Sequence, residues 1–437
     1  MKFTLALAAL LLSTFVAQAS VIAIIDSGVD YRHEALITNM WKNPLELRNR
    51  LDDDSNGLVD DIFGWNFAEN NNLVIDYKYL GTFSDDPYKF FQLQAKGFLG
   101  TLSTEDKDWI AEKRADPEFM KEMQKFGNFV HGTHVSGIAA RGNDEAKIMA
   151  IKLIPTEASP FITELNFAFD PKIELIKILL DKLAAAQMDQ LKTITTYVGT
   201  NKADVANGSF GTSYSQLMSM LKQVAPNADE AMVSELVKHF LTKLIDNGNK
   251  MVGAAPETLF VFAAGNDGTD NDLYPTSPAN IQASNVISVG ATYERGKLAS
   301  FSNFGKTSVD VAAPGVIIES AIPGDEYLKV SGTSQAAPYV ANIAGQIKDT
   351  NPELTAEEIK RIIMGTVDLK PFLLGKVKAN GMVNADRAIF AAKLSNKISL
   401  NKAILKSRTE VLDIATPKLR FNDEEGFVLP LQSTINF

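Results

Sequence analysis

Three segments that lie far apart in the sequence carry side chains with the chemistry of an acid, a base and a nucleophile. Asp26 directly follows the β-branched run 21–25 (VIAII), and functional groups of open α/β sheets gather at the carboxyl ends of such strands. His131 opens the segment HGTHVSG, whose small residues predict that a closely packed helix begins there. The positive end of a helix disfavours an imidazolium, which would keep His131 neutral and suited to act as a general base. Ser334 lies in the segment GTSQAAP, just before an apolar helical pattern.

Each of these residues also has a purely structural explanation when it is taken alone. An aspartate after a strand is commonly a turn former or a helix cap, and a serine before a helix is commonly a cap. His134 follows His131 by three residues, so a two-histidine metal site has to be considered. The HExxH pattern of zinc proteases is absent, and we therefore disfavour metal ligation by this pair.

The joint occurrence of the segments, in this order, changes the interpretation. A further segment, 263–268 (AAGNDG), lies between the histidine and serine segments and places an amide side chain on a glycine-flanked turn. From Val21 to about Ala392 the chain resembles the subtilisin-like serine proteases (subtilase family, peptidase S8). The chain order of aspartate, histidine and serine is known from that family and is not deduced from the residues.

The resemblance implies a role for each matching residue. Asp26 corresponds to the orienting acid, His131 to the base, Ser334 to the nucleophile and Asn266 to the oxyanion-hole asparagine. Substrate-binding positions are also implied, and they are Ser209, Phe210, Gly211, Ala264 and Gly265. Gln335 stands where the family commonly has methionine, and Tyr339 where it commonly has histidine.

The implied activity is that of an exported serine endopeptidase that acts on protein or peptide substrates through an acyl-enzyme intermediate. Its chemistry requires no cofactor. One alternative is a catalytically inactive subtilase that serves as a binding module. A lipase or esterase is disfavoured, because the GxSxG elbow is missing around Ser334.

Strand and helix patterns alternate along the chain, and this alternation predicts the fold class. Apolar runs predict strands at 21–25, 148–154, 259–263, 286–289 and 309–312. Helical patterns occupy 172–191, 214–224, 229–246, 335–348 and 355–364. We expect an α/β fold, a subtilisin-like three-layer sandwich with a mostly parallel sheet and helices on both faces.

The expected domain organisation has three parts. Residues 1–19 have the layout of a secretory signal peptide: Lys2, an uncharged apolar run at 3–17, and an AxA cleavage site. The alternative is an uncleaved N-terminal membrane anchor, which we disfavour because the run is short for a membrane span and the cleavage residues fit. Residues 20–395 form the peptidase domain, with loops or insertions near 66–128, 155–203 and 212–257. A tail, 396–437, follows. Subtilases usually carry a long N-terminal pro-segment, whereas here only Ser20 separates the expected cleavage site from the first strand. We therefore hypothesise that the tail restrains activity or completes the fold.

Charge and composition narrow the location and the partners. The 437 residues include 43 basic and 53 acidic side chains, a net charge of −10, which argues against nucleic acid as a partner. The absence of cysteine excludes thiol catalysis, thiolate metal sites and disulfides. Beyond the signal peptide, no stretch approaches the length of a membrane span, so we expect no stable membrane insertion after cleavage. The expected location is periplasmic or secreted.

An aspartate-rich segment, 52–61 (DDDSNGLVDD), predicts a structural calcium site. It resembles DxDxNGxxD loops, with oxygen ligands at alternate positions, although Phe63 stands where an EF-hand has glutamate. Carboxylates packed this densely repel one another unless a cation or solvent intervenes. The alternative is a solvated acidic turn. The expected ligands are Asp52, Asp54, Asn56 and Asp60.

Overall fold

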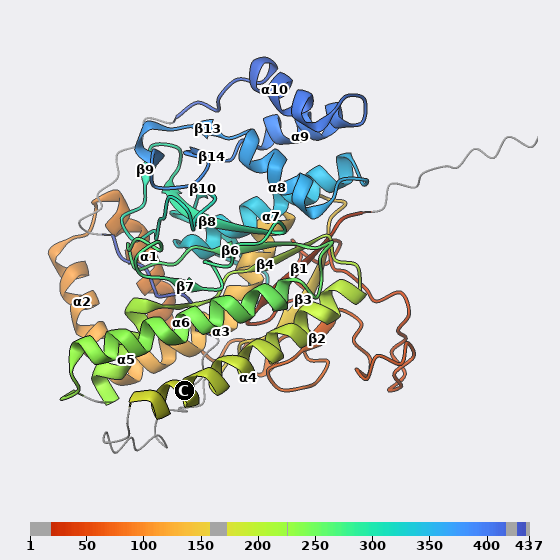
Figure 1. Ribbon diagram of the computed structural model, residues 1–437. Coiled ribbons are helices and arrows are strands. Elements are labelled where there is room, and N and C mark those ends of the chain that lie inside the picture. The colour runs from red at the N-terminus through yellow and green to blue at the C-terminus, as the bar shows by residue number, and fades with distance from the viewer. Residues whose placement is uncertain (1–18, 158–172, 225, 417–425, 434–437) are drawn as a thin grey trace, which may run out of the picture.

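The computed structural model describes residues 19–157, 173–224, 226–416 and 426–433. The expected signal peptide therefore lies, except for Ala19, outside the described residues. Within the described part, a ten-stranded sheet forms the centre of the molecule (Figure 1), with the strand order β13-β14-β10-β8-β6-β4-β1-β3-β2 and β9 paired to β8.

The central strands of this sheet are parallel to one another. Only the pairs β13–β14 and β8–β9 are antiparallel. The strands of the sheet are β1 (Val21–Asp26), β2 (Gly64–Asn66), β3 (Lys147–Lys152), β4 (Val205–Gly208), β6 (Leu259–Ala263), β8 (Val286–Tyr293), β9 (Lys297–Leu298), β10 (Val311–Pro314), β13 (Asp368–Leu369) and β14 (Gly381–Met382). Two small sheets pair β5 (Thr212–Ser213) with β7 (Thr276–Ser277) and β11 (Ile318–Ile322) with β12 (Glu326–Val330).

Helices cover both faces of the sheet, which confirms the expected three-layer α/β architecture. Because side chains alternate along a strand, Ile22 and Ile24 of β1 pack into one core and Ala23 and Ile25 into the other. The first core includes the end of α3 (Pro117–Ala140), α7 (Thr333–Thr350), α8 (Ala356–Gly365) and α9 (Ala385–Ser395). The second includes α4 (Ile173–Thr200), α5 (Tyr214–Val224) and α6 (Glu230–Val252), and α4 and α6 run side by side (Figure 1).

The expected strands and helices are confirmed, with shifts of a few residues at their ends. The largest differences in length are in α4, which continues nine residues past the expected end at 191, and in α6, which continues six residues past the expected end at 246. β4, at the centre of the sheet, was not expected, because its four residues, VANG, carry only a short apolar signal.

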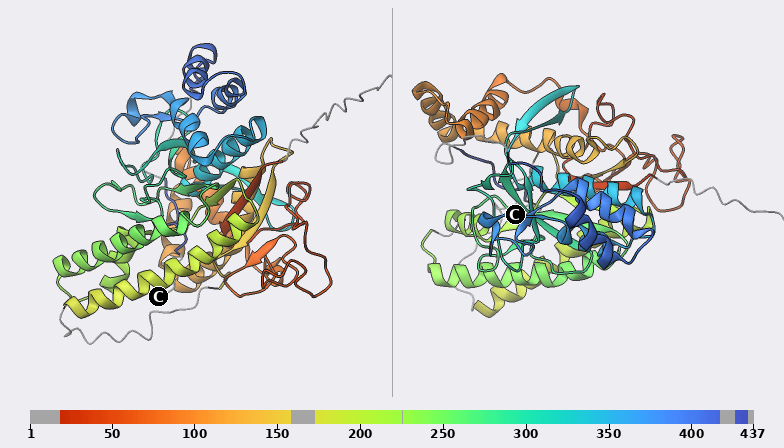
Figure 2. Two further views of the ribbon diagram at one scale, coloured as in Figure 1. Left: turned by 45° about the vertical axis from the view of Figure 1, so that its right-hand side comes forward. Right: turned by 90° about the horizontal axis from the view of Figure 1, so that it is seen from above.

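The stretch 66–128 is largely helical. It holds the short 3₁₀ helix η1 (Tyr77–Tyr79), α1 (Asp85–Leu99), α2 (Thr104–Ala115) and the first half of α3. Ser103 and Asp106 form a reciprocal capping box at the start of α2. These helices bury an aromatic cluster against the β11–β12 hairpin, and Figure 2 shows α1 and α2 in orange beside that hairpin. The stretch is thus a helical unit with its own core, packed next to the sheet.

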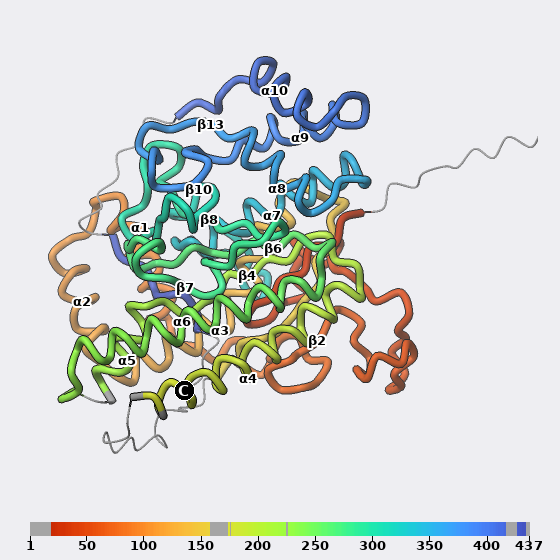
Figure 3. Tube along the Cα trace, in the orientation of Figure 1, coloured from red at the N-terminus to blue at the C-terminus, as the bar shows by residue number. Residues whose placement is uncertain are grey.

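The tail begins with α10 (Leu400–Glu410), which packs on α8 and α9. Its last described part, residues 426–433, lies elsewhere. Figure 3 shows this dark-blue segment close to α1 and β7, apart from α10. The remaining 3₁₀ helix, η3 (Pro371–Leu373), lies between β13 and β14. In the described part of the chain, no helix combines the length and the apolarity needed to cross a bilayer.

Candidate active site

The carboxyl ends of the central strands and two helices bring the candidate residues to one cleft. Asp26 is the last residue of β1, His131 lies in α3 and Ser334 is the second residue of α7. His131, Ser334 and Asn266 line a single open cleft of about 1170 Å³. Asp26 is fully buried behind the histidine.

The carboxylate of Asp26 holds the imidazole of His131. Its Oδ1 lies 2.7 Å from Nδ1 of His131, and it also accepts a hydrogen bond from the backbone N–H of Ser27. A neutral imidazole facing a carboxylate through Nδ1 carries its proton on that nitrogen, so the lone pair is on Nε2. Because the histidine side chain is 14% exposed, this nitrogen remains accessible from the cleft. The pair is therefore arranged as a base with its orienting acid.

The helix carrying His131 begins earlier than the sequence predicts, and this corrects the argument from the helix dipole. α3 begins at Pro117, with Asp116 as its N-cap, so His131 lies in the second half of the helix and not at its positive end. The reason is that residues 117–130 are themselves helical, and this part of the helix buries Phe119 and Phe126 in the aromatic cluster. The helix dipole therefore does not explain a neutral His131.

The small residues of the HGTHVSG segment allow α3 to approach β1 closely. A Cβ on Gly132 would overlap the backbone of Gly28, and the N–H of Gly132 donates to the hydroxyl of Ser27 at 3.2 Å. The Thr133 hydroxyl accepts a hydrogen bond from the N–H of Asp30. These contacts fix the distance between α3 and the end of β1, and thus between His131 and Asp26.

His134 does not contribute to the candidate site. It is buried, and its Nε2 lies 3.0 Å from the carbonyl oxygen of Leu328, to which it donates. Burial lowers its pKa to about 3, because the charged form cannot be solvated there. The residue is a neutral packing histidine that ties α3 to the β11–β12 hairpin.

The hydroxyl of Ser334 donates its hydrogen bond to the backbone in this structure. Its Oγ donates to the backbone carbonyl of Ser209 at 3.1 Å, while the Ser209 hydroxyl donates to the carbonyl of Ser334 at 3.0 Å. A hydroxyl has one proton, so the O–H of Ser334 must turn from Ser209 before it can give that proton to His131.

The amide group of Asn266 has a fixed orientation. Its Oδ1 accepts hydrogen bonds from the backbone N–H and the hydroxyl of Thr333, at 2.9 and 2.8 Å. Nδ2 must then point the other way, into the cleft, where it donates to the carbonyl oxygen of Leu429 at 3.1 Å. Gly265 has a positive φ of 120° and no room for a side chain beside Asn303, so glycine is required before Asn266. Nothing in the sequence marks Thr333 as the residue that holds this amide.

The expected substrate-binding positions offer backbone groups. The side chains of Phe210 and Ala264 are buried in the core, and the Ser209 hydroxyl is engaged with Ser334. The N–H of Gly211 donates to the carbonyl oxygen of Gln432 at 2.9 Å. A chain segment thus already pairs with this edge of the cleft.

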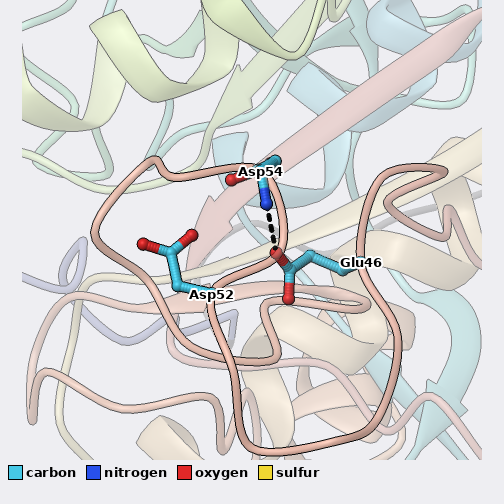
Figure 4. Close-up of side chains that lie close together, drawn as sticks. All are labelled: Glu46, Asp52 and Asp54. Atoms are coloured by element: carbon cyan, nitrogen blue, oxygen red, sulfur yellow. Dashed lines mark hydrogen bonds between the residues drawn. The ribbon is translucent and has the colours of Figure 1, made fainter.

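Away from the cleft, the aspartate-rich loop brings together three carboxylates (Figure 4). Oxygen atoms of Glu46, Asp52 and Asp54 lie within 4.8 Å of one another. Oε1 of Glu46 accepts from the backbone N–H groups of residues 53 and 54, whereas its Oε2 is buried and has no hydrogen-bond partner. Burial raises the pKa of Glu46. Glu46 stands six residues before the loop pattern, and nothing in the sequence marks it.

The other two expected ligands have different partners. Asp60 accepts hydrogen bonds from the N–H groups of Asn49 and Arg50. The amide nitrogen of Asn56 donates to Asp54 and Asp61, and its Oδ1 accepts from the N–H of Leu58. Of the four expected ligands, Asp52 and Asp54 are therefore in the carboxylate cluster with Glu46.

Comparison with known proteins identifies the family. The model of the subtilase family, Peptidase_S8, matches residues 17–395. Subtilisin-like protease 1 of Plasmodium falciparum (isolate 3D7) is 26% identical over 391 residues, which cover 88% of this chain and 45% of that protein. Subtilisin Savinase of Lederbergia lenta is 28% identical over 261 residues, 59% of this chain and 77% of that protein. The chain thus spans about half the length of the Plasmodium relatives that it matches.

Solved structures that align with this chain include the following two. A cold-adapted subtilisin-like serine proteinase aligns with a TM-score of 0.44 and 18% identity, covering 85% of this chain and 89% of that one. A structure of the subtilase cytotoxin SubAB assembly aligns with a TM-score of 0.48 and 18% identity, covering 90% and 92%. Because the family model matches most of the sequence, the chain belongs to the subtilase family of serine peptidases.

Proposed function

We propose that the protein is an exported serine endopeptidase that hydrolyses peptide bonds in protein or peptide substrates. The observation that carries this proposal is the 2.7 Å contact between Asp26 and His131, at a cleft that also contains the Ser334 hydroxyl and the Asn266 amide. The family supports peptidase chemistry in general. The roles of these four residues, the cleavage of internal bonds and export are our proposal.

Each residue has a chemical task in the proposed reaction. The Ser334 hydroxyl rotates from Ser209 towards Nε2 of His131, which takes the proton as Oγ attacks the peptide carbonyl carbon. Asp26 stabilises the resulting imidazolium. His131 then gives the proton to the leaving amine, and an acyl-enzyme remains. A water molecule then gives a proton to the same imidazole as it attacks the ester, and His131 returns that proton to Oγ of Ser334 as the acyl group leaves.

The charge that develops on the carbonyl oxygen requires fixed donors. Asn266 supplies one N–H through Nδ2, and the backbone N–H of Ser334 lies in the first turn of α7, where helical N–H groups have no acceptor within the helix. One such donor contributes about 100- to 1000-fold to the rate. Because Thr333 holds the amide before substrate binds, little reorganisation is needed in the transition state.

The test is a comparison of the purified protein with its Ser334→Ala variant. We expect the parent to cleave a random peptide library at internal bonds and to react with a fluorophosphonate probe at Ser334. The variant should do neither, although its melting temperature should remain within a few degrees. Ser300→Ala, at an exposed serine, is the matched control and should retain activity. Equal peptide hydrolysis by the Ser334→Ala variant would overturn the proposal.

A catalytically inactive binding module remains the second candidate. It is favoured by the hydrogen bond that the Ser334 hydroxyl donates to the carbonyl oxygen of Ser209. The same probe separates the two candidates, because a serine that is never activated by His131 does not react with a fluorophosphonate.

We also propose that the carboxylate cluster binds a structural calcium ion. Glu46, Asp52 and Asp54 supply hard oxygen ligands, the class that calcium prefers. The buried and unpartnered Oε2 of Glu46 supports the proposal, because an isolated carboxylate oxygen is costly to bury without a cation or donor. The ion would stabilise the loop that precedes β2. It would have no part in peptide hydrolysis.

A further inference from the structure

The last described segment of the chain, residues 426–433, lies in the cleft of the candidate active site. Four of the residues that line the cleft beside His131 and Ser334 are Leu429, Pro430, Leu431 and Gln432. Leu431 is 5% exposed and belongs to the core on the α7 side of the sheet. The segment is therefore anchored in the cleft by the buried side chain of Leu431, whereas Pro430 is exposed.

The segment is held by hydrogen bonds from both sides of the cleft. On one side, Gly211 donates its N–H to the carbonyl oxygen of Gln432, and the side chain of Gln216 donates to the carbonyl oxygen of Leu431 at 2.9 Å. On the other side, the side-chain amide of Gln432 donates to Asn128 of α3 at 3.1 Å. Phe210 and Gln432 form a parallel β-bridge, so the segment binds by adding itself to a backbone edge.

An aromatic anchor holds the start of the segment. The ring of Phe427 lies 5.0 Å from that of Phe90 in α1, between ring centres, and the guanidinium of Arg114 lies 4.6 Å from the Phe427 ring centre. These contacts join the segment to the helical unit formed by α1, α2 and the first half of α3. The start of the segment thus packs against this helical unit.

The segment also engages the group proposed to stabilise the oxyanion. The carbonyl oxygen of Leu429 accepts a hydrogen bond from Nδ2 of Asn266 at 3.1 Å. A substrate carbonyl needs this same donor, and a substrate backbone needs the N–H of Gly211. Two chains cannot use these donors at once, so the segment and a substrate exclude each other.

The resident segment is not arranged for attack. The Ser334 hydroxyl donates to Ser209 and not to His131, so its proton is not positioned for transfer. Pro430, which follows Leu429, fixes its own φ and lowers the conformational entropy lost on binding. Covalent attachment adds an effective concentration of about millimolar, so even a weak complex would keep the cleft filled.

We propose that residues 426–433 are an intramolecular inhibitor that competes with substrate for Asn266 and Gly211. This inference rests on the proposed peptidase function. An inhibitor within the chain would keep the cleft closed in most of the folded molecules, and so lower the activity of the full chain, until the segment is displaced or removed. Release of this segment from the cleft is then the step that controls activity.

The experiment compares four forms of the protein: the full chain, a chain ending at Thr416, full-length Leu431→Asp and full-length Leu412→Asp. Leu431→Asp places a charge in the buried position of the segment. Leu412→Asp makes the same change at a side chain that is 84% exposed and outside the cleft, and it is the matched control. The readouts are the rate of fluorophosphonate labelling at Ser334 and kcat/KM on a peptide substrate.

We expect the shortened chain and Leu431→Asp to react about tenfold faster or more than the full chain and the control, which corresponds to a cleft open in at most about one molecule in ten. A synthetic peptide of residues 426–433 should inhibit the shortened chain competitively. Equal rates in all four forms would overturn the inhibitor while leaving the peptidase proposal intact. If no form labels at Ser334, the peptidase proposal itself fails. If the shortened chain does not fold, Leu431→Asp against Leu412→Asp decides the question alone.

Discussion

Gly132 of α3 packs directly on the backbone of Gly28, so closely that a Cβ on Gly132 would overlap the carbonyl group and the nitrogen of Gly28. Gly28 follows β1 by two residues, and Gly132 follows His131. The contact therefore sets how near the imidazole comes to Asp26. The geometry of the proton-transfer pair thus depends on a contact between two glycines, neither of which takes part in the reaction.

We predict that Gly132→Ala will impair catalysis more than it lowers stability. The added Cβ pushes α3 away from β1 and lengthens the bond between Asp26 and His131, and a misplacement of about 1 Å can cost 100-fold in rate. Overpacking of this kind costs about 1–3 kcal/mol in the free energy of unfolding. The measurements are kcat/KM and unfolding in denaturant.

Gly127→Ala is the matched change in the same helix, since a Cβ there would meet no atom within 4 Å. It should stabilise the protein by about 0.5–1 kcal/mol, because alanine is the better helix former. Loss of stability in both variants to the same extent would show that the Gly28 contact has no special role.

Thr333 is a positioning residue, and we predict that its substitution will lower kcat without raising KM. Thr333→Val removes the hydroxyl that donates to Oδ1 of Asn266 and leaves only the backbone N–H of Thr333 to orient the amide. The loss should be about tenfold, smaller than the 100- to 1000-fold expected for losing the donor altogether. Thr333→Ser keeps the hydroxyl and should restore the rate. A rise in KM at constant kcat would contradict a role in the transition state.

We predict that burial of His134 makes the protein less stable in acid. Its pKa is about 3 in the folded chain and 6.5 when exposed, so between these values the unfolded chain binds the extra proton. The free energy of unfolding therefore falls as the pH drops through 6.5 towards 3, by at most about 1.4 kcal/mol per pH unit from this residue.

The check for His134 is the pH dependence of unfolding in His134→Gln, whose amide can still donate to Leu328. This variant should lose less stability than the parent between pH 6 and pH 4, and shifts at other groups cancel in the difference. Parallel curves for the two proteins would rule out a buried neutral His134.

The calcium proposal predicts that a chelator will lower the melting temperature. An ion at 100 times its dissociation constant stabilises the folded state by about 2.7 kcal/mol. Glu46→Gln should abolish the response to the chelator, because it removes a charged ligand. Asp60→Asn should keep the response, because Asp60 accepts from Asn49 and Arg50 instead of joining the cluster. The measurement is thermal unfolding with and without chelator; no response in the parent would refute the site.

Much of the fold could be predicted from the sequence, because the signals for it are local. The run 21–25 is apolar throughout, as a strand buried on both faces must be, and the pattern over 355–364 repeats with the period of a helix. The prediction that α3 begins at His131 is wrong, because the segment HGTHVSG contains small residues that also occur where helices begin. Its small side chains serve instead to let a helix pass close to a strand.

The sequence by itself determined the layered α/β arrangement and the residue types of the candidate site, since strand runs, helix periods and family segments are all read within a few dozen residues. Only the tertiary structure decided that Glu46 joins Asp52 and Asp54, that Thr333 holds Asn266, and that Leu429 occupies the amide of Asn266. Those relationships depend on side chains packed together from elements up to 163 residues apart. Such contacts are selected by the free energy of the whole fold, and no local pattern encodes them.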